Sequence, residues 1–527
     1  MHPNWSGILW VEMDTNSVPR QVNSLETVPS WKNGGSTRAR CALRKSKTTV
    51  SIASSQRDPV MDLARVICLA LVVAGHLLML GAFVSGHNAL VIERTLLLQP
   101  WFTPVSWIAQ VMPLFFVVGG FAGARSWRRL EASGGSPAGF IMARVQRLAR
   151  PAVPLFMLLA VAILVLQFSG LAPLAVAQIA TGVASPLWFL AAYTFSQAYL
   201  PGMAALHAVA PLRTLGGLAA GAIVIDVLRY TTHITVLGLF NMIFVWLFIQ
   251  QLGIWAEGGW FAARSRLNLV LLAFASYVTL GVITTLGPYP ANMLDNLNPP
   301  TAALAVLAAA QFTILTLLHP LLARAMDNRT LQLVVTGVSR RLMTVYLWHL
   351  PVLALIVGVL LLTPLPMPAP GSAAWWATRP LILAAAILVL LGISRLLGRF
   401  EEPARHRPGQ RMRVSDLVTG ASSALVIIPP FLVVTFGLNL AIAVAGALLL
   451  SAAVLLPRGM LLARTAPPPR GTLLVGPLAK SELVHIEHQH DAAERQGDPE
   501  DPSPARLRQR RRDEDDERKE DDAVPSE

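Results

Sequence analysis

Cysteine and charge are both scarce in this sequence. Among 527 residues there are two cysteines, Cys41 and Cys68, so the sequence supports neither a disulfide framework nor a cysteine metal site. Charged residues make up 14% of the chain and hydrophobic residues 54%, whereas soluble proteins average about 25% charged residues. This balance excludes an ordinary soluble enzyme and is typical of a polytopic membrane protein.

Sequence motifs for nucleotide hydrolysis and serine catalysis are missing as well. There is no phosphate-binding glycine loop, and no serine follows a strand in a nucleophile turn. We expect no metal site, because the histidines of residues 485–490 fall in a polar tail where we interpret them as solvated. The net charge of +13 does not indicate a nucleic-acid partner, because the basic residues lie mostly between apolar runs and in the tails, as membrane orientation requires.

Long apolar runs dominate what is present. A run of about 20 apolar residues can cross a bilayer as a helix. Such runs recur at 61–84, 103–124, 152–170, 186–200, 215–230, 234–252, 268–287, 301–322, 342–363, 380–398, 416–436 and 438–456. We therefore predict an all-α polytopic membrane protein, with a bundle of about ten transmembrane helices plus a C-terminal two-helix hairpin.

Composition divides the chain into four segments. We predict a disordered basic N-terminal extension at 1–57, a main transmembrane domain at 58–408, an additional transmembrane hairpin at 409–457 and a disordered charged tail at 458–527. Arginines concentrate in alternate connections, whereas the loops on the other side carry only Arg94 and Arg379. This asymmetry predicts a multi-pass protein of the plasma (inner) membrane with both termini cytoplasmic.

The first apolar run contains three ionisable residues. Asp62 and Arg65 stand at its start and His76 lies well inside it. Eleven helical steps of about 100° separate Arg65 from His76, so both side chains share one face roughly 16 Å apart. Ionisable groups within a span are costly unless they face a polar interior, which makes this stripe a candidate catalytic site. The alternative is a helix start with interfacial charges and one hydrogen-bonded core histidine.

The second run ends in a glycine-rich and then arginine-rich segment. Gly120 and its neighbouring glycines permit close helix contact. Arg125 and Arg128 are three residues apart and should point the same way, with Arg129 beside them. Guanidinium groups bind phosphate oxygens bidentately, so this set could hold a phosphorylated ligand. The alternative is that these arginines only set the membrane orientation.

Two later segments supply further candidates. His349 lies in an apolar run just before Pro351, where it could hydrogen-bond a substrate or equally be a packed core residue. Trp188 lies in PLWFL, which could contact a substrate but is more typical of an interfacial aromatic belt. Glu401 and Glu402 follow the tenth run, and we expect their charges to brace nearby arginines.

Taken in order, these motifs resemble those of acyltransferase family 3, the multi-span membrane O-acyltransferases that include O-antigen and surface-polysaccharide acetylases. The shared features run over about 57–408 and are Asp62 and Arg65 followed by His76, PLFFVVGGF, Arg125-x-x-Arg128, RLARPAVPLF, PLWFL, YLWHLP and Glu402-Pro403. The sequence departs from the family where it has Gly119-Gly120-Phe121 in place of Ser-Gly-Phe, and Pro186-Leu187 before Trp188.

The resemblance implies a function and a set of site residues. It implies transfer of an acetyl or other short acyl group from acyl-CoA to a hydroxyl of a glycan, glycolipid or related cell-envelope acceptor. His76, Arg65 and Asp62 would then be catalytic, the arginines 125, 128 and 129 would bind the acyl-CoA, and His349 and Trp188 would contact substrate.

Two questions stay open at this point. His76 could act as a general base on the acceptor hydroxyl or as a nucleophile that forms an acyl-histidine. The competing functions are a transporter or flippase of a lipid-linked sugar and a non-catalytic subunit of surface-polymer assembly. A transporter would favour paired broken spans in two related halves, and the sequence shows no such pairing.

Overall fold

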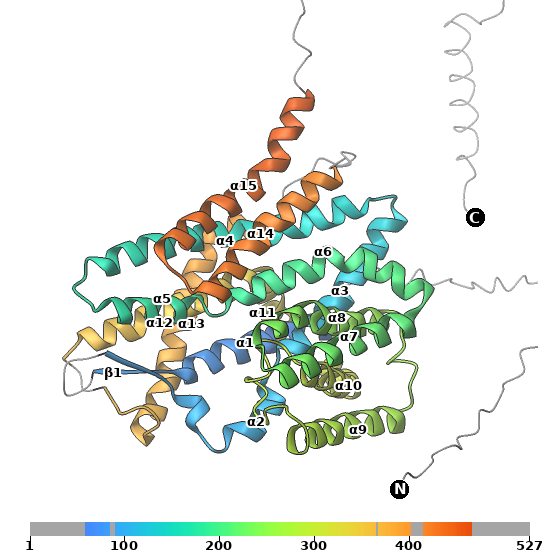
Figure 1. Ribbon diagram of the computed structural model, residues 1–527, viewed down its shortest axis with the longest axis horizontal. Coiled ribbons are helices and arrows are strands. Elements are labelled where there is room, and N and C mark those ends of the chain that lie inside the picture. The colour runs from blue at the N-terminus through green and yellow to red at the C-terminus, as the bar shows by residue number, and fades with distance from the viewer. Residues whose placement is uncertain (1–57, 85–89, 365–366, 402–414, 466–527) are drawn as a thin grey trace, which may run out of the picture. The chain divides into compact units, whose positions relative to one another are not determined.

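The computed structural model describes residues 58–84, 90–364, 367–401 and 415–465 (Figure 1). The predicted terminal extension, the tail beyond residue 465 with its histidines, and Glu402 lie outside these residues. The described helices are α1 (Pro59–Met79), α2 (Phe102–Ala109), α3 (Met112–Ala132), α4 (Pro137–Gln167), α5 (Pro173–Ala184), α6 (Leu187–Val209), α7 (Pro211–Thr232), α8 (Asn241–Glu257), α9 (Arg266–Thr285), α10 (Ala302–Ala325), α11 (Arg329–Arg340), α12 (Leu342–Leu362), α13 (Ala373–Glu401), α14 (Asp416–Phe436) and α15 (Leu440–Thr465).

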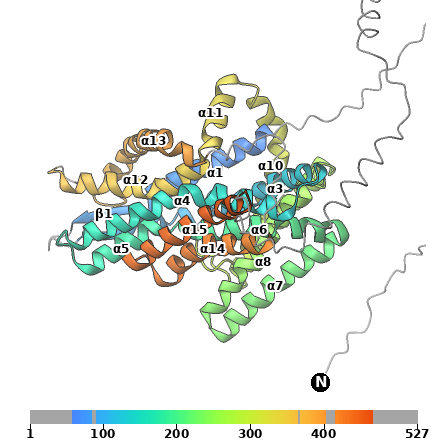
Figure 2. The same cartoon turned by 90° about the horizontal axis from the view of Figure 1, so that it is seen from above.

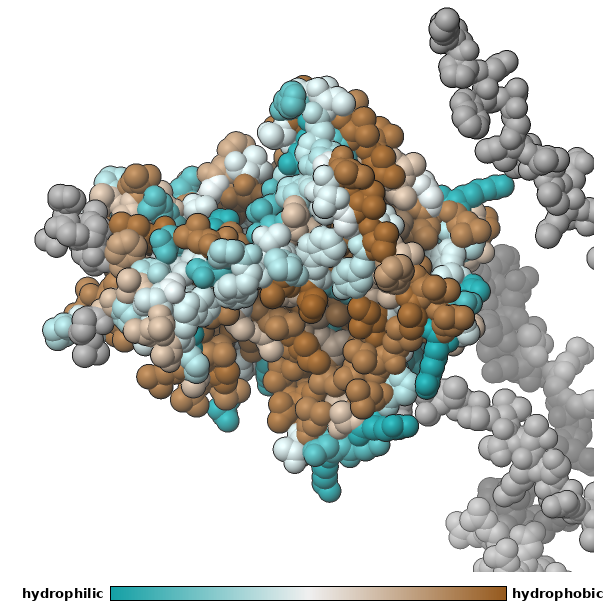
Figure 3. Space-filling model, turned by 90° about the horizontal axis from the view of Figure 1, so that it is seen from below, coloured by the Kyte–Doolittle hydropathy of each residue, from teal (hydrophilic) through white to brown (hydrophobic). Residues whose placement is uncertain are grey.

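Twelve helical stretches in the described residues are long and apolar enough to cross a membrane. Large apolar side chains also lie on the outside of the bundle, such as Phe274 at 67% exposure and Leu388 at 70%. Hydrophobic side chains cover large parts of the face shown in Figure 3. An apolar exterior of this kind is stable in lipid and not in water, so the prediction of an all-α polytopic membrane protein is confirmed.

Helix α1 packs against α3, α10, α11, α12 and α13. Figure 2 shows it next to α11. Its start is fixed by Asp58, whose side chain accepts a hydrogen bond from the backbone N–H of Val60 at 2.9 Å. This N-cap satisfies a donor that the helix leaves unpaired.

The predicted end of the first span, at residue 84, is wrong. Helix α1 ends at Met79, and the following apolar residues form strand β1 (Leu80–Val84), which pairs antiparallel with β2 (Leu90–Arg94). A one-turn 3-10 helix, η1 (Thr95–Leu98), follows, and a second, η2 (Thr235–Phe240), precedes α8. Hydropathy alone does not separate an apolar helix end from an apolar strand.

The second predicted span, 103–124, is broken in the structure. Helix α2 ends at Ala109 and α3 begins at Met112, with Pro113 in its first turn. Proline is tolerated there because the first N–H groups of a helix have no intrahelical partner. Gln311 of α10 donates to the carbonyl of Gln110 at 2.9 Å, which satisfies a backbone group that the break exposes.

Helix α4 begins earlier than the third predicted span, 152–170. Its first residue is Pro137, and the Ser136 hydroxyl accepts a hydrogen bond from the N–H of Gly139. The additional hairpin, α14 and α15, packs against α4 and α6 (Figure 1). Gln146 of α4 donates to the carbonyl of Ala453 in α15 at 2.8 Å. The helix α15 extends to Thr465, beyond the predicted end of the hairpin at 457.

Glycines allow α3 and α8 to approach closely. A larger side chain at this contact should therefore destabilise the protein. A Cβ on Gly253 of α8 would overlap the Val117 carbonyl, and a Cβ on Gly120 would overlap the Gln250 carbonyl. We expect Gly253→Ala to lower the free energy of unfolding by about 1–3 kcal/mol, because two backbones would have to separate. Thermal unfolding in detergent measures this.

The control for that prediction is Gly392→Ala in α13, where an added Cβ has no atom of a neighbouring helix within 4 Å. Alanine is the better helix former, so this variant should be neutral or stabilised by up to about 1 kcal/mol. Equal melting temperatures for Gly253→Ala and the unchanged protein would contradict the prediction.

Candidate active site

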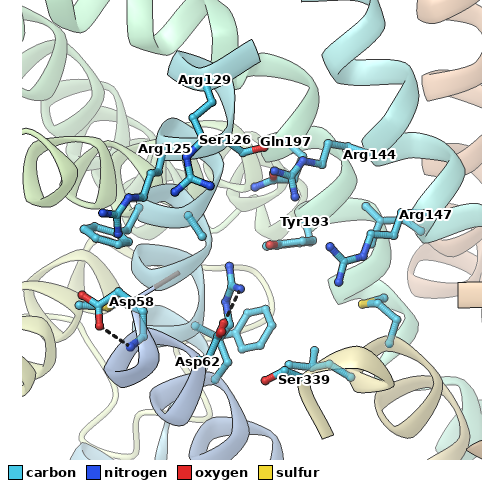
Figure 4. Close-up of a pocket in the computed structure, with 18 residues that line it drawn as sticks. Asp58, Asp62, Arg125, Ser126, Arg129, Arg144, Arg147, Tyr193, Gln197 and Ser339 are labelled. Carbon is cyan, nitrogen blue, oxygen red and sulfur yellow. Dashed lines mark hydrogen bonds and ion pairs between the residues drawn. The ribbon is translucent and has the colours of Figure 1, made fainter. Parts of the chain in front are cut away.

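A polar cavity of about 270 Å³ lies among α1, α3, α4 and α6, beside the junction of α11 and α12 (Figure 4). Five arginines contribute to its lining: Arg65, Arg125, Arg129, Arg144 and Arg147. The acidic residues in the lining are Asp58 and Asp62, so its formal net charge is three positive units. Tyr193, Gln197 and Ser126 add polar groups.

Helix α3 supplies two of the three arginines predicted from its sequence. Arg125 and Arg129 line the cavity, and Figure 4 shows both side chains directed toward it. Arg128 is not in the lining; its Nη2 lies 2.8 Å from Oε2 of Glu257, at the end of α8. Residues four apart on a helix diverge by about 40° and those three apart by about 60°. The structure therefore joins Arg125 with Arg129 rather than with Arg128.

Helix α4 supplies two arginines that were not among the predicted ligand-binding residues. Arg144 and Arg147 reach the cavity from the side opposite Arg125 (Figure 4). The guanidinium of Arg144 also lies 5.0 Å from the ring centroid of Phe140. Ser136 followed by Pro137 is a helix-start signal, and it could have placed these arginines on a helix beside α3.

Helix α1 brings Asp62 and Arg65 together as its sequence predicted. Their side chains form an ion pair with Nη1 and Oδ1 3.5 Å apart, and both line the cavity. Asp58 is held by its cap and by His319, whose Nε2 lies 3.4 Å from its carboxylate. Both acidic groups of the lining therefore already have partners.

The other four arginines of the cavity have no acidic partner within 4.0 Å among the described residues. Like charges gathered without counter-charges repel each other, so a bound anion would stabilise this arrangement. Guanidinium forks bind phosphate and carboxylate groups bidentately. The cavity is therefore suited to a ligand with several anionic oxygens.

His76 lies outside the lining of this cavity. It is eleven residues beyond Arg65, or roughly 16 Å along α1. Its ring packs against that of His349 in α12, with the two centroids 4.9 Å apart. His349 is fully buried, whereas His76 is partly exposed. The structure thus brings together two histidines from distant parts of the sequence, and it places them further along α1 than Arg65.

Trp188, which was predicted to contact substrate, lies in the core. It is 5% exposed, and its ring stacks on Trp246 at a centroid distance of 5.4 Å. Trp246 in turn stacks on Phe116 at 4.2 Å. Trp188 contributes to neither the cavity lining nor the histidine pair, because the first turn of α6 directs it into this aromatic stack.

Glu401, at the end of α13, holds the start of α12 rather than an arginine. Its carboxylate accepts hydrogen bonds from the N–H of Met343 at 2.9 Å, and from the N–H and the hydroxyl of Thr344 at 3.2 and 2.7 Å. In the part of the chain that the structure describes, no arginine forms an ion pair with Glu401, so the expected brace is not found there. A carboxylate at a helix N-terminus satisfies free N–H groups and matches the helix dipole, which fixes the helix that carries His349.

This cap gives a second stability prediction. Glu401→Ala leaves buried donors without acceptors and should lower the free energy of unfolding by about 1–3 kcal/mol. Glu401→Gln keeps one acceptor oxygen, so its free energy of unfolding should fall less than that of Glu401→Ala. Thermal unfolding in detergent compares these variants with Glu131→Gln, which changes an exposed glutamate at the end of α3. If Glu401→Ala lowered the free energy of unfolding no more than Glu131→Gln does, Glu401 would not stabilise the start of α12.

A second cavity of about 290 Å³ adjoins the first and shares Asp58, Met61 and Phe121 with it. Its other walls come from α8, α9, α10 and the turn after α8, and they include Phe261 and Phe312. Arg266 and His319 are the basic residues in its lining. Aromatic walls with few polar groups are suited to a flat, largely apolar group.

Fold and site together define a polytopic helical membrane protein with an arginine-lined cavity at one end of the bundle and a histidine pair deeper within it. The family model described as "Acyltransferase domain" matches residues 58–395, which is more than half of the chain. The chain belongs to this family, acyltransferase family 3, as its sequence motifs indicated. No curated protein and no solved structure matches it.

Proposed function

We propose that this membrane acyltransferase moves an acetyl or other short acyl group from acyl-CoA to a hydroxyl of a glycan or glycolipid of the cell envelope. The observation that carries the proposal is the cavity with five arginines, four of them without an acidic partner among the described residues. Coenzyme A carries a diphosphate and a 3′-phosphate, which match such a set of guanidinium groups.

The donor enters from the arginine-rich end in this proposal. That end would face the cytoplasm, because positively charged loops stay inside. The phosphates would be held by Arg125, Arg129, Arg144 and Arg147, and the adenine would lie in the neighbouring cavity lined by Phe261. The thin pantetheine arm would run along α1 and carry the thioester toward His76, roughly 16 Å from Arg65.

His76 would act as the general base. It removes the proton of the acceptor hydroxyl as that oxygen attacks the thioester carbonyl, and an imidazole titrates near neutral pH, which suits this task. The new C–O bond forms as the C–S bond breaks, and the CoA thiolate takes up the proton that His76 had removed, which returns His76 to its neutral form. The ion pair of Arg65 with Asp62 would orient the guanidinium toward the donor.

The direct test uses membranes that contain the protein, labelled acetyl-CoA and the envelope glycans of a strain that lacks it. We expect label in the glycan fraction only when the protein is present, and mass spectrometry should show the deletion strain's glycans lighter by the mass of the acyl group. Accumulation of unchanged glycan precursor without any dependence on acetyl-CoA would instead support a transporter.

A further inference from the structure

The contact between His76 and His349 involves ring nitrogens and not only packed faces. Nδ1 of His76 lies 2.9 Å from the carbonyl oxygen of Val72 and 3.2 Å from Nε2 of His349. Nδ1 of His349 is hydrogen-bonded to the carbonyl oxygen of Tyr346. The two rings and two backbone carbonyls therefore form one chain of hydrogen bonds.

The chemistry of the carbonyl group fixes where the hydrogens lie in this chain. A carbonyl oxygen only accepts hydrogen bonds, so Nδ1 carries the hydrogen in both histidines. A neutral imidazole has one N–H, so Nε2 of His349 carries a lone pair. That lone pair faces the N–H on Nδ1 of His76, which is shared between it and Val72. A hydrogen on Nε2 of His349 would instead bring two N–H groups face to face.

The surroundings of the two rings favour their neutral forms. No carboxylate among the described residues pairs with either histidine, and His349 is fully buried. A charge on either ring would lack a counter-charge within the membrane interior.

We propose that His349 is a positioning residue that holds His76 in the Nδ1–H form, so that Nε2 of His76 is the basic nitrogen. Val72 lies one turn before His76 on the same helix, so its carbonyl alone ties the ring only to α1. His349 comes from α12 and fixes the rotation of the ring from across the bundle. A base oriented by a third group is a recurring arrangement in catalysis.

The same contact stabilises the ring after it accepts a proton. Protonation at Nε2 gives an imidazolium whose other N–H still points to two acceptors, the Val72 carbonyl and Nε2 of His349. The catalytic meaning of this arrangement depends on the proposed function. The hydrogen-bond chain itself does not depend on that function, because it is present when neither the acyl donor nor the glycan acceptor is bound.

Nitrogen NMR of the full-length protein in lipid bilayers, with ¹⁵N-labelled histidine, tests the proposal directly. We expect a His76 signal with Nδ1 protonated and Nε2 unprotonated, and a coupling through the hydrogen bond between Nδ1 of His76 and Nε2 of His349. His76→Asn and His349→Gln assign the two rings by loss of their signals. A protonated Nε2 on resting His76, or no coupling between the rings, would overturn the proposal.

Kinetics of three variants separates positioning from packing. His349→Leu removes the acceptor on α12 and leaves the Nδ1–H of His76 bonded only to Val72 of its own helix. The ring can then rotate, so kcat should fall about 10–100-fold with little change in the donor KM. His349→Gln can offer its side-chain oxygen near the position of Nε2 and should recover most of kcat. His207→Leu removes a histidine that pairs with Gln251, away from the site, and should retain kcat. Equal kcat for the Leu and Gln variants would contradict the proposal.

The two experiments also separate this proposal from the proposed function. If no variant and not even the unchanged protein transfers an acyl group, the proposed function fails. The NMR spectrum still decides the hydrogen positions in that case, and it needs no substrate. If transfer occurs but His76 is protonated at Nε2, only the role given to His349 fails.

Discussion

His76→Ala is expected to lower kcat for acyl transfer by about 10²–10⁴-fold, because it removes the group proposed to take the acceptor proton. The donor KM should change little, since His76 lies outside the arginine-lined cavity. The measurement is the initial rate of label transfer from acetyl-CoA in membranes with equal amounts of protein. His76→Gln should be as inactive as His76→Ala, because an amide hydrogen-bonds but does not accept a proton at neutral pH.

The matched control for His76 is His207→Ala. His207 lies in α6, where its Nδ1 is 3.0 Å from Nε2 of Gln251, and it belongs to neither cavity. The initial rate of acyl transfer by His207→Ala should stay within about twofold of that of the unchanged protein, because the substitution lies away from the site. Undiminished transfer by His76→Ala would remove the proposed base while leaving family membership intact.

Local periodicity predicted the parts of the site that one helix contains. Asp62, Arg65 and His76 belong to α1, so helix geometry alone relates them, and the structure shows the ion pair between the first two. The number of membrane spans follows from hydropathy for a similar reason, because each apolar run is recognised from its own residues and needs no contact with another segment. Errors arose at their ends, as at Met79, where strand and helix are equally apolar.

Contacts between distant segments could not be read from one sequence. His349 stands 273 positions from His76, and only the packing of α12 on α1 brings their rings together. Glu257 draws Arg128 away from the cavity in the same manner, from the end of α8. Arg144 and Arg147 could have been placed from the sequence. Ser136 and Pro137 signal a helix start before them, but the predicted span began only at residue 152, so these arginines were not assigned to α4.

Removing single cavity arginines should weaken donor binding more than it slows the chemical step. Arg125→Ala and Arg144→Ala are each expected to raise the KM for acetyl-CoA about 10–150-fold, since a hydrogen bond to a charged group contributes about 1.5–3 kcal/mol. Lysine at either position keeps the charge but loses the bidentate fork, so its KM should fall between those of arginine and alanine. The inhibition constant of free CoA, measured in parallel, should follow the same order.

Arg128→Ala is the control that makes this prediction specific to the cavity. Arg128 belongs to the same helix and the same arginine run, but its side chain is 51% exposed and pairs with Glu257. Because Arg128 does not line the cavity, the KM for acetyl-CoA should rise less than about fivefold in Arg128→Ala. If Arg128→Ala raised KM as much as Arg125→Ala and Arg144→Ala, the arginines would act through the general charge of this end of the protein. A specific effect of Arg125 and Arg144 would instead persist at high salt, where exposed charges are screened within about 3 Å at 1 M.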